Sequence, residues 1–190
     1  IDTPGEASFI SEALGSLPVV ESVLVAVNAV TKVEVQTERL WKRAKDMGVS
    51  RLVAVNMMDR ERAYFGEVLA ALRARFGDEA VAIALPIGEE AGFKGVVDLI
   101  GMKAYTYSGG AGKGTEGPIP DDLKAAADEA REALVDRVAE SDDALLEKYL
   151  EGNELSSDEI TVALKAALAN GSVAPVIPVC AAKNIGFDRL

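Results

Sequence analysis

The opening residues IDTPG place a carboxylate and a glycine three positions apart at a sharp bend. Asp2 can hold Mg²⁺ through a water molecule, and Gly5 can bring its backbone N–H against a terminal phosphate. Thr3 and Pro4, which lie between them, belong to the same candidate site. Because Asp-x-x-Gly is common, it indicates nucleotide triphosphate chemistry only together with further motifs.

A second motif, VNMMD, directly follows the apolar run 52–55. Ligands of open α/β sheets bind at the carboxyl ends of strands, which is where Asn56, Met57 and Asp59 stand. A carboxylate there accepts hydrogen bonds from the ring N–H and the 2-amino group of guanine, and adenine lacks both donors. Leaving that carboxylate unpaired rejects an analogue by about 10⁴ or more. An Asx-rich turn after a strand accounts for the same residues equally well.

A third motif, VIPVCAAKNIG, carries small residues past the end of another apolar run. At Cys180, Ala181 and Ala182 backbone N–H groups can approach a flat base. Small residues after a strand are also selected by packing alone, so this motif does not by itself indicate nucleotide binding.

The glycine-rich loop 103–117 (KAYTYSGGAGKGTEG) is similar to a phosphate loop. That motif requires Gly-x-x-x-x-Gly-Lys-Ser/Thr between a strand and a helix. With Gly112 and Lys113 at its end, the first glycine would stand at position 107, which is Tyr107. Prolines follow where the helix should begin. We therefore predict a flexible, solvated hairpin or loop with no role in nucleotide binding.

The elements around these motifs alternate between strand and helix. Unbroken apolar runs at 23–27 and 52–55 predict parallel strands buried on both faces, joined by a helix that ends at Gly48. A helix at about 61–76 and a strand at about 175–180 complete the α/β pattern.

The middle of the chain has a different pattern. Short β-rich runs from about 81 to 107 predict a small antiparallel patch, and about 120–170 is a helical block whose last helix has a capping box at 156–159. We predict a parallel α/β core formed by residues 1–80 and 172–190, interrupted by an inserted α+β subdomain at 81–171.

Composition excludes several classes of function. The 190 residues contain no His, which removes a His-based metal site or general base, and one Cys, which gives no disulfide framework. A net charge of −11 disfavours direct binding of nucleic acid or an anionic membrane. The longest apolar run, 173–182, is shorter than the roughly 20 residues that span a bilayer. We expect a cytoplasmic protein and, because the chain begins without Met, a fragment.

In this order the motifs resemble the GTP-binding domain of translation elongation factor G and, within that group, the divergent elongation-factor-G-like proteins. The stretches that carry the resemblance are IDTPGEASFISEALGSL, NAVTKVEVQTERLW, RLVAVNMMDRERAYF, GVVDLIGMKAYTY, LLEKYLEGNELSSDEI and PVIPVCAAKNIGFDRL. It implies a GTPase sheet whose first strands and phosphate loop precede residue 1. It also implies GTP or GDP and Mg²⁺ bound through Asp2–Gly5, Asn56–Asp59 and Cys180–Ala182, with residues 2–16 as the second switch.

The resemblance also implies a role and partners. The intact family spends GTP on moving or recycling ribosomes, and its insertion is thought to meet the ribosomal stalk protein. It implies no sequence-specific nucleic-acid binding and no membrane. The parent protein would be a GTPase, whereas the chain alone would be inactive without the phosphate loop.

Three positions depart from the family pattern. Glu6 stands where the family has its catalytic His, so we expect weak or absent ribosome-stimulated hydrolysis. Met57 replaces a Lys, which predicts guanine preference with reduced affinity. Cys180 replaces a Ser, for which we expect a minor effect and no reactive thiol.

Two other functions remain open at this stage. One is a non-catalytic protein-interaction module that uses the helices at 120–170 and binds no nucleotide. The other is a nucleotide kinase built on GAGKGT within the glycine-rich loop. If the family's strand order holds, the run 23–27 also becomes an exposed sheet edge, which predicts poor solubility or dimerisation of the isolated chain.

Overall fold

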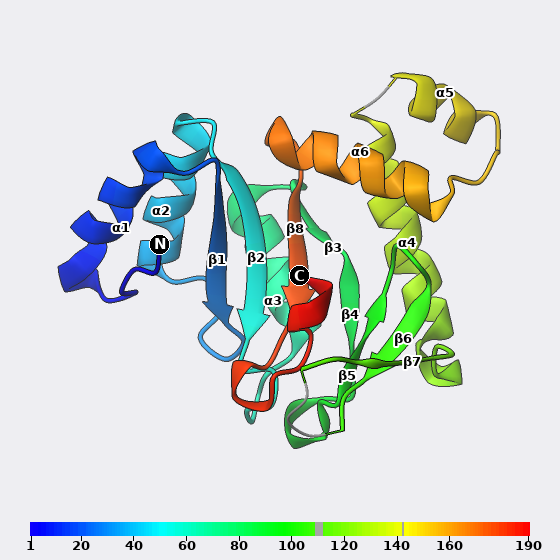
Figure 1. Ribbon diagram of the computed structural model, residues 1–190, viewed down its shortest axis with the longest axis horizontal. Coiled ribbons are helices and arrows are strands. Elements are labelled where there is room, and N and C mark those ends of the chain that lie inside the picture. Colours follow the sequence, from blue (N-terminus) through cyan, green and yellow to red (C-terminus); the bar gives the residue numbers. More distant parts are fainter. Residues whose placement is uncertain (109–111, 142) are drawn as a thin grey trace.

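The computed structural model describes residues 1–108, 112–141 and 143–190, which form two four-stranded sheets (Figure 1). In spatial order, the first sheet contains β1 (Ser22–Asn28), β2 (Ser50–Asn56), β8 (Ala174–Pro178) and β3 (Ala80–Ala82), and the second contains β4 (Ala84–Ile87), β5 (Gly95–Asp98), β6 (Lys103–Thr106) and β7 (Thr115–Gly117). The first sheet is parallel and the second is antiparallel. The predicted α/β class with a parallel sheet and an α+β segment is confirmed.

The helices cover the parallel sheet and extend beside the antiparallel one (Figure 1). Their bounds are α1 (Ile10–Ser16), α2 (Val35–Asp46), α3 (Phe65–Phe76), α4 (Lys124–Ala139), α5 (Asp143–Leu150) and α6 (Ser157–Ala169). Helix α2 packs on β1 and β2, α3 on β3, and α4 on both α6 and β3. The predicted capping box of α6 is present, because Ser156 N–H donates to Glu159 Oε2 at 2.8 Å and Glu159 N–H donates to Ser156 Oγ at 3.3 Å.

The two apolar runs that were expected to be equally buried differ in the structure. Val53 and Val55 of β2 are fully buried, as predicted. In β1, however, Leu24 is 50% exposed and Val27 is the only buried residue. Strand β1 lies at the edge of the described sheet with β2 as its neighbour, whereas β2 has a strand on both sides. The prediction of a strand buried on both faces is therefore wrong for β1, and its effect on solubility stays a prediction.

The apolar run VAIAL does not lie wholly in the antiparallel patch. Its first part, in β3, pairs in parallel with β8, and its last part, in β4, pairs with β5. Ile83 connects the two sheets, since its N–H donates to Val176 O at 3.0 Å and its C=O accepts from Leu99 N–H at 3.1 Å. The antiparallel patch is thus confirmed from Ala84 onward, and a continuous backbone joins it to the parallel sheet.

A buried polar cluster closes the amino-terminal end of the parallel sheet. Arg51 is 2% exposed, donates to Gly171 O at 2.9 Å, and lies 5.3 Å from the ring centroid of Trp41. Trp41 Nε1 donates to Glu79 Oε1 at 2.8 Å, and its ring stacks on Phe76 with a centroid distance of 4.1 Å. These contacts tie α2, α3 and the segment after α6 to the start of β2. The other end of β2, at Asn56, is partly exposed.

Among the described residues, no helix combines the length and the apolar character that crossing a membrane requires.

Candidate nucleotide-binding site

Asn56 links the second and third predicted motifs. Its side-chain Oδ1 accepts hydrogen bonds from Met57 N–H at 2.8 Å and from Ala181 N–H at 2.9 Å. Met57 has a φ of 64°, so the chain bends sharply as it leaves β2. Parallel pairing of β2 with β8 delivers both segments to the same sheet edge, where Val179 N–H donates to Val55 O at 2.8 Å. Two segments that lie 125 residues apart in sequence are therefore joined through one amide side chain.

Asp59 lies beside the same junction with its side chain 17% exposed. Burial alone would raise the pKa of this carboxyl. A hydrogen bond from the Cys180 thiol and the Lys183 ammonium outweigh burial and lower the pKa below its ordinary value. Lys183 Nζ lies 3.5 Å from Asp59 Oδ2. The carboxylate is thus held ionised at neutral pH, as an acceptor of guanine N–H groups must be.

Cys180 is fully buried, and its thiol hydrogen-bonds to the Asp59 carboxylate. Burial raises the pKa of its thiol, and the hydrogen bond to Asp59 raises it further. A buried thiol with a raised pKa is a poor nucleophile, because the thiolate is the reactive form. This agrees with the expectation that Cys180 is not a reactive cysteine.

Residues 180–186, called here the Cys180 turn, present an open backbone surface next to Asp59. The 3₁₀ turn η5 (Ala181–Lys183) begins directly after Cys180, and Ala181 and Ala182 are exposed. A methyl side chain leaves the peptide plane accessible to a flat ligand. Asp59 retains acceptor capacity beyond the thiol and the ammonium, since a carboxylate offers about four lone-pair sites. These residues fit the hydrogen-bonding edge of guanine.

The opening segment, Asp2–Gly5, does not join this cluster. Asp2, Pro4 and Gly5 are exposed, and Figure 1 shows the N-terminus beside α1, on the other side of β1 from the Cys180 turn. A Cβ built on Gly5 would have nothing within 4 Å. Protein packing therefore does not require glycine at this position, whereas close approach of a phosphate would. Gly5 and Glu6 line a groove of about 820 Å³ together with the residues 33–36.

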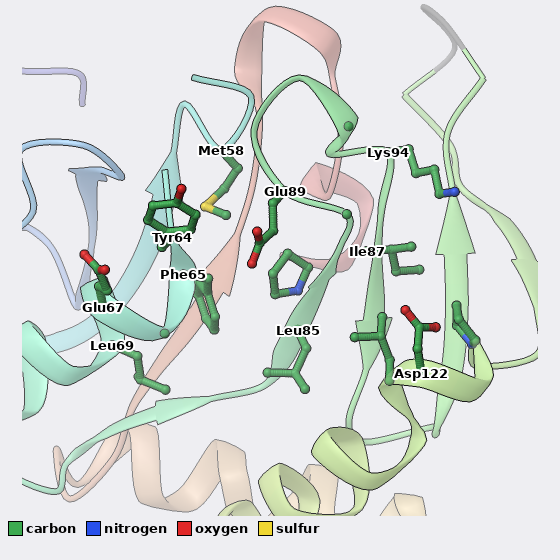
Figure 2. A pocket seen from close by; sticks show the side chains of 16 residues that line it. Met58, Tyr64, Phe65, Glu67, Leu69, Leu85, Ile87, Glu89, Lys94 and Asp122 are labelled. Atoms are coloured by element: carbon green, nitrogen blue, oxygen red, sulfur yellow. The ribbon is translucent and has the colours of Figure 1, made fainter. Parts of the chain in front are cut away.

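A separate groove of about 860 Å³ lies between the start of α3 and β4 (Figure 2). Apolar side chains such as Phe65, Leu85 and Ile87 form its walls, with Glu89 and Lys94 among its polar groups. None of the predicted nucleotide-contacting residues lines it. Their neighbour Met58, which does line it, is buried, while Asn56 and Asp59 contact the Cys180 turn instead.

Comparison with known proteins agrees with this geometry. Residues 1–190 match the family described as the elongation factor Tu GTP binding domain. The chain belongs to this family. It is 40% identical over 190 residues to an elongation factor G-like protein from Thermotoga maritima, covering all of this chain and 27% of that protein. A crystal structure of a protein from Thermus thermophilus superposes with a TM-score of 0.87 at 32% identity, over 97% of this chain and 27% of that one.

The chain is thus a GTP-binding domain of the elongation factor family, similar to that of an elongation factor G-like protein, and it spans about a quarter of the length of these relatives. The predicted resemblance is confirmed.

The described residues on either side of the glycines in 103–117 form paired strands, as in a β-hairpin and not as in a phosphate loop. Strand β6 pairs antiparallel with β7, so a strand follows the loop where a phosphate loop requires a helix. The predicted hairpin is therefore present, but the residues nearest its glycines contact protein as well as solvent. Tyr107 and Gly114 hydrogen-bond to Asp188, and Gly112 lies against Asn184. Residues 109–111 lie outside the described part of the chain.

Sequence reasoning missed two charged residues of this region. Lys183 pairs with Asp59 although it follows the predicted Ala182 directly in the sequence, so its position was a usable signal. Asp188 holds the hairpin through both carboxylate oxygens, and its partners stand 74 and 81 residues away. No local sequence pattern predicts a contact between residues so far apart in the chain.

Proposed function

We propose that the protein carrying this chain binds GTP and GDP through the predicted residues and acts on the ribosome as a translocation- or recycling-type factor. The observation that supports the proposal is the bond from Ala181 N–H to Asn56 Oδ1, together with the contacts of Asp59 with Cys180 and Lys183 beside it. Asp59 would accept from the guanine ring N–H and 2-amino group. Because Ala181 N–H already donates to Asn56 Oδ1, the backbone N–H of Ala182 would face the base oxygen. Met57, with its side chain 40% exposed, would cover the base.

The opening segment supplies the other half of the proposed site. Asp2 would hold Mg²⁺ through water, while Thr3 and Pro4 shape the turn that brings Gly5 N–H toward the γ-phosphate. When bound, Mg²⁺ neutralises charge on the phosphates. We propose that residues 2–16 rearrange when the γ-phosphate is lost, which agrees with the exposure of Asp2 and Gly5.

Glu6 bears on hydrolysis. It is exposed at the start of a short 3₁₀ turn and carries a carboxylate where the family places its catalytic His. A carboxylate next to phosphate oxygens is repelled electrostatically. We propose weak ribosome-stimulated hydrolysis, which measurement of GTP turnover with ribosomes checks on the full-length protein and on Glu6→Ala. Strong stimulation that is unchanged by the substitution contradicts this proposal.

The inserted segment is the proposed partner surface. We propose that residues 81–171 form a subdomain inserted into a core of residues 1–80 and 172–190, and that its helices meet the ribosomal stalk protein in the cytoplasm. Leu150 on α5 and Val162 on α6 are 75% and 68% exposed, as suits apolar contacts with a protein partner. The proposal includes no sequence-specific nucleic acid and no membrane, consistent with the net charge of −11.

Equilibrium binding of fluorescent GDP, with GTP and ATP as competitors, tests the nucleotide proposal. The measurement uses the chain itself and the full-length protein from the gene that encodes it. We expect only the full-length protein to bind, with GTP but not ATP competing. A full-length protein that binds no nucleotide would favour a non-catalytic interaction module. ATP binding that Lys113→Ala abolishes would favour the nucleotide kinase, and either result would contradict the proposal.

A further inference from the structure

The hairpin β6–β7 of the inserted segment contacts the Cys180 turn and the residues just after it (Figure 1). The Tyr107 hydroxyl donates to Asp188 Oδ1, and Gly114 N–H donates to Asp188 Oδ2 at 3.0 Å. Tyr107 is itself anchored, because its backbone N–H donates to Lys94 O at 2.9 Å. Both oxygens of Asp188 are therefore held by residues from one distant hairpin.

Gly112 makes the closest approach to the turn. Its φ is +63°, and a Cβ at this position would lie 2.2 Å from Asn184 Nδ2. Asn184 is itself in the left-handed conformation, with a φ of 53°, and caps the end of η5. Any side chain at position 112 would thus be strained by its backbone and would displace the end of the Asn184 side chain, which is exposed.

Two backbone hydrogen bonds close the Cys180 turn into a loop, so a displacement of one of its residues affects the others. Cys180 N–H donates to Ile185 O and Ile185 N–H donates to Cys180 O, both at 3.0 Å. Gly186 seals the loop against the strand, since a Cβ there would lie 2.8 Å from Pro178 O. A shift of the backbone of this loop would therefore reach the segment that carries Ala181 and its bond to Asn56.

The charges around Asp188 stabilise its contact with the hairpin. Burial would raise the pKa of the Asp188 carboxyl, but hydrogen bonds from Tyr107 and Gly114 and the charge of Arg189 outweigh it and lower the pKa. Burial, followed by Asp188 itself, raises the pKa of Tyr107, so the phenol stays a donor. Arg189 lies over the ring of Tyr105 at 4.3 Å, which adds a further contact between the same two segments.

We infer that the hairpin positions the base-binding turn, with Tyr107, Gly112 and Asp188 as positioning residues for guanine recognition. The inference rests on the proposed guanine site. It gives the glycine-rich loop a role, positioning of the Cys180 turn, that is different from phosphate binding. It also makes the inserted segment able to alter guanine affinity, because whatever displaces the hairpin displaces the turn.

The test uses Tyr107→Phe and Gly112→Ala in the full-length protein, with two matched controls. Tyr105→Phe, two residues before Tyr107, removes a hydroxyl whose partner is Glu116 at 3.4 Å and leaves the ring under Arg189. Gly117→Ala adds a methyl group where nothing lies within 4 Å. Two readouts are measured: the Kd for fluorescent GDP, and amide hydrogen exchange of residues 181–186 in the nucleotide-free protein.

We expect Tyr107→Phe to weaken GDP binding about tenfold, as for the loss of one hydrogen bond to a charged group. Gly112→Ala should weaken it in the same direction, through the strained backbone at position 112. Exchange at residues 181–186 should become faster, while the melting temperature and both controls stay near wild type. If wild type binds GDP and both readouts are unchanged in Tyr107→Phe and Gly112→Ala, the inference is overturned. If wild type binds no GDP, the proposed function fails, and hydrogen exchange alone decides the inference: faster exchange supports it and unchanged exchange overturns it.

Discussion

The two halves of the proposed nucleotide site differ in how the fold forms them. Around Asn56 and Asp59, backbone and side-chain bonds already join β2 to the Cys180 turn. The opening segment Asp2–Gly5 is mostly exposed, and nothing lies within 4 Å of a Cβ built on Gly5. Contacts within the folded domain thus hold the proposed base site, whereas the proposed phosphate-binding segment has no comparable contacts among the described residues. A preformed base site beside a segment with few contacts would suit the proposed switch, which keeps its nucleotide while it responds to the γ-phosphate.

The largest expected effect follows from changing the acceptor in the rigid half. Asp59→Asn should weaken GDP binding to the full-length protein by about 10³-fold or more, because an amide cannot accept both guanine donors. Fluorescence titration measures it, with Asp78→Asn as an exposed control at the other end of the sheet. A Kd within a few-fold of wild type for Asp59→Asn would show that the base is bound elsewhere.

Stability should depend on the opposite end of the sheet. Glu79→Ala leaves Arg51 buried without its carboxylate, which lies 3.5 Å away, and should lower the free energy of unfolding by about 3–5 kcal/mol. Urea denaturation measures it, with the exposed Glu21→Ala as the control. We expect the Kd for GDP of the folded variant to remain unchanged. A loss below about 1 kcal/mol would mean that the cluster does not hold the sheet.

A positive charge at position 57, where the family has Lys, tests the base-binding half of the proposed site. Met57→Lys places an ammonium at a half-exposed position beside the proposed base site, and should tighten GDP and GTP binding about tenfold. ATP affinity should not change. Competition titrations compare this variant with Met57→Leu, which keeps an apolar stem. Equal guanine affinities in the two variants would remove Met57 from the explanation of reduced affinity.

The smallest effect concerns α6, in the segment proposed as an insertion. Lys148, followed by the Ser156 cap, lowers the pKa of Glu159 to about 2, below its ordinary value of 4.5. Its contribution to stability is therefore complete above pH 4.5 and is lost as the pH falls toward 2. Unfolding measured across this range should show a shallower acid loss in Glu159→Gln than in wild type. The exposed Glu147→Gln should behave like wild type.

Features that depend on local spacing could be predicted from the sequence. The apolar run at 52–55 became the buried strand β2, and the Ser156–Glu159 capping box formed as its spacing indicates. Asn56 and Cys180 were each predicted to stand at the carboxyl end of a parallel strand, and they lie together at one edge of the sheet. Each of these depends on a rule that operates over a few residues or over one strand pair.

Features that depend on distant neighbours could not be predicted. The composition of β1 is as apolar as that of β2, but its burial depends on which strand lies beside it. Tyr107 and Gly112 gave no sign of contact with residues 184–188, because local composition described only a glycine-rich turn. Lys183 was adjacent to the predicted motif, yet its pairing with Asp59 depends on the bend after β2.

Hydrogen exchange of the nucleotide-free full-length protein tests the central claim most directly. The amides of Ala181 and Ile185 donate to Asn56 Oδ1 and Cys180 O, so we predict that both are protected before nucleotide is added. The amides of residues 3 and 5 should exchange fast and slow down only with a non-hydrolysable GTP analogue. If Ala181 and Ile185 exchange as fast as the opening segment until GDP binds, the base site is not preformed and the contrast between the two halves fails.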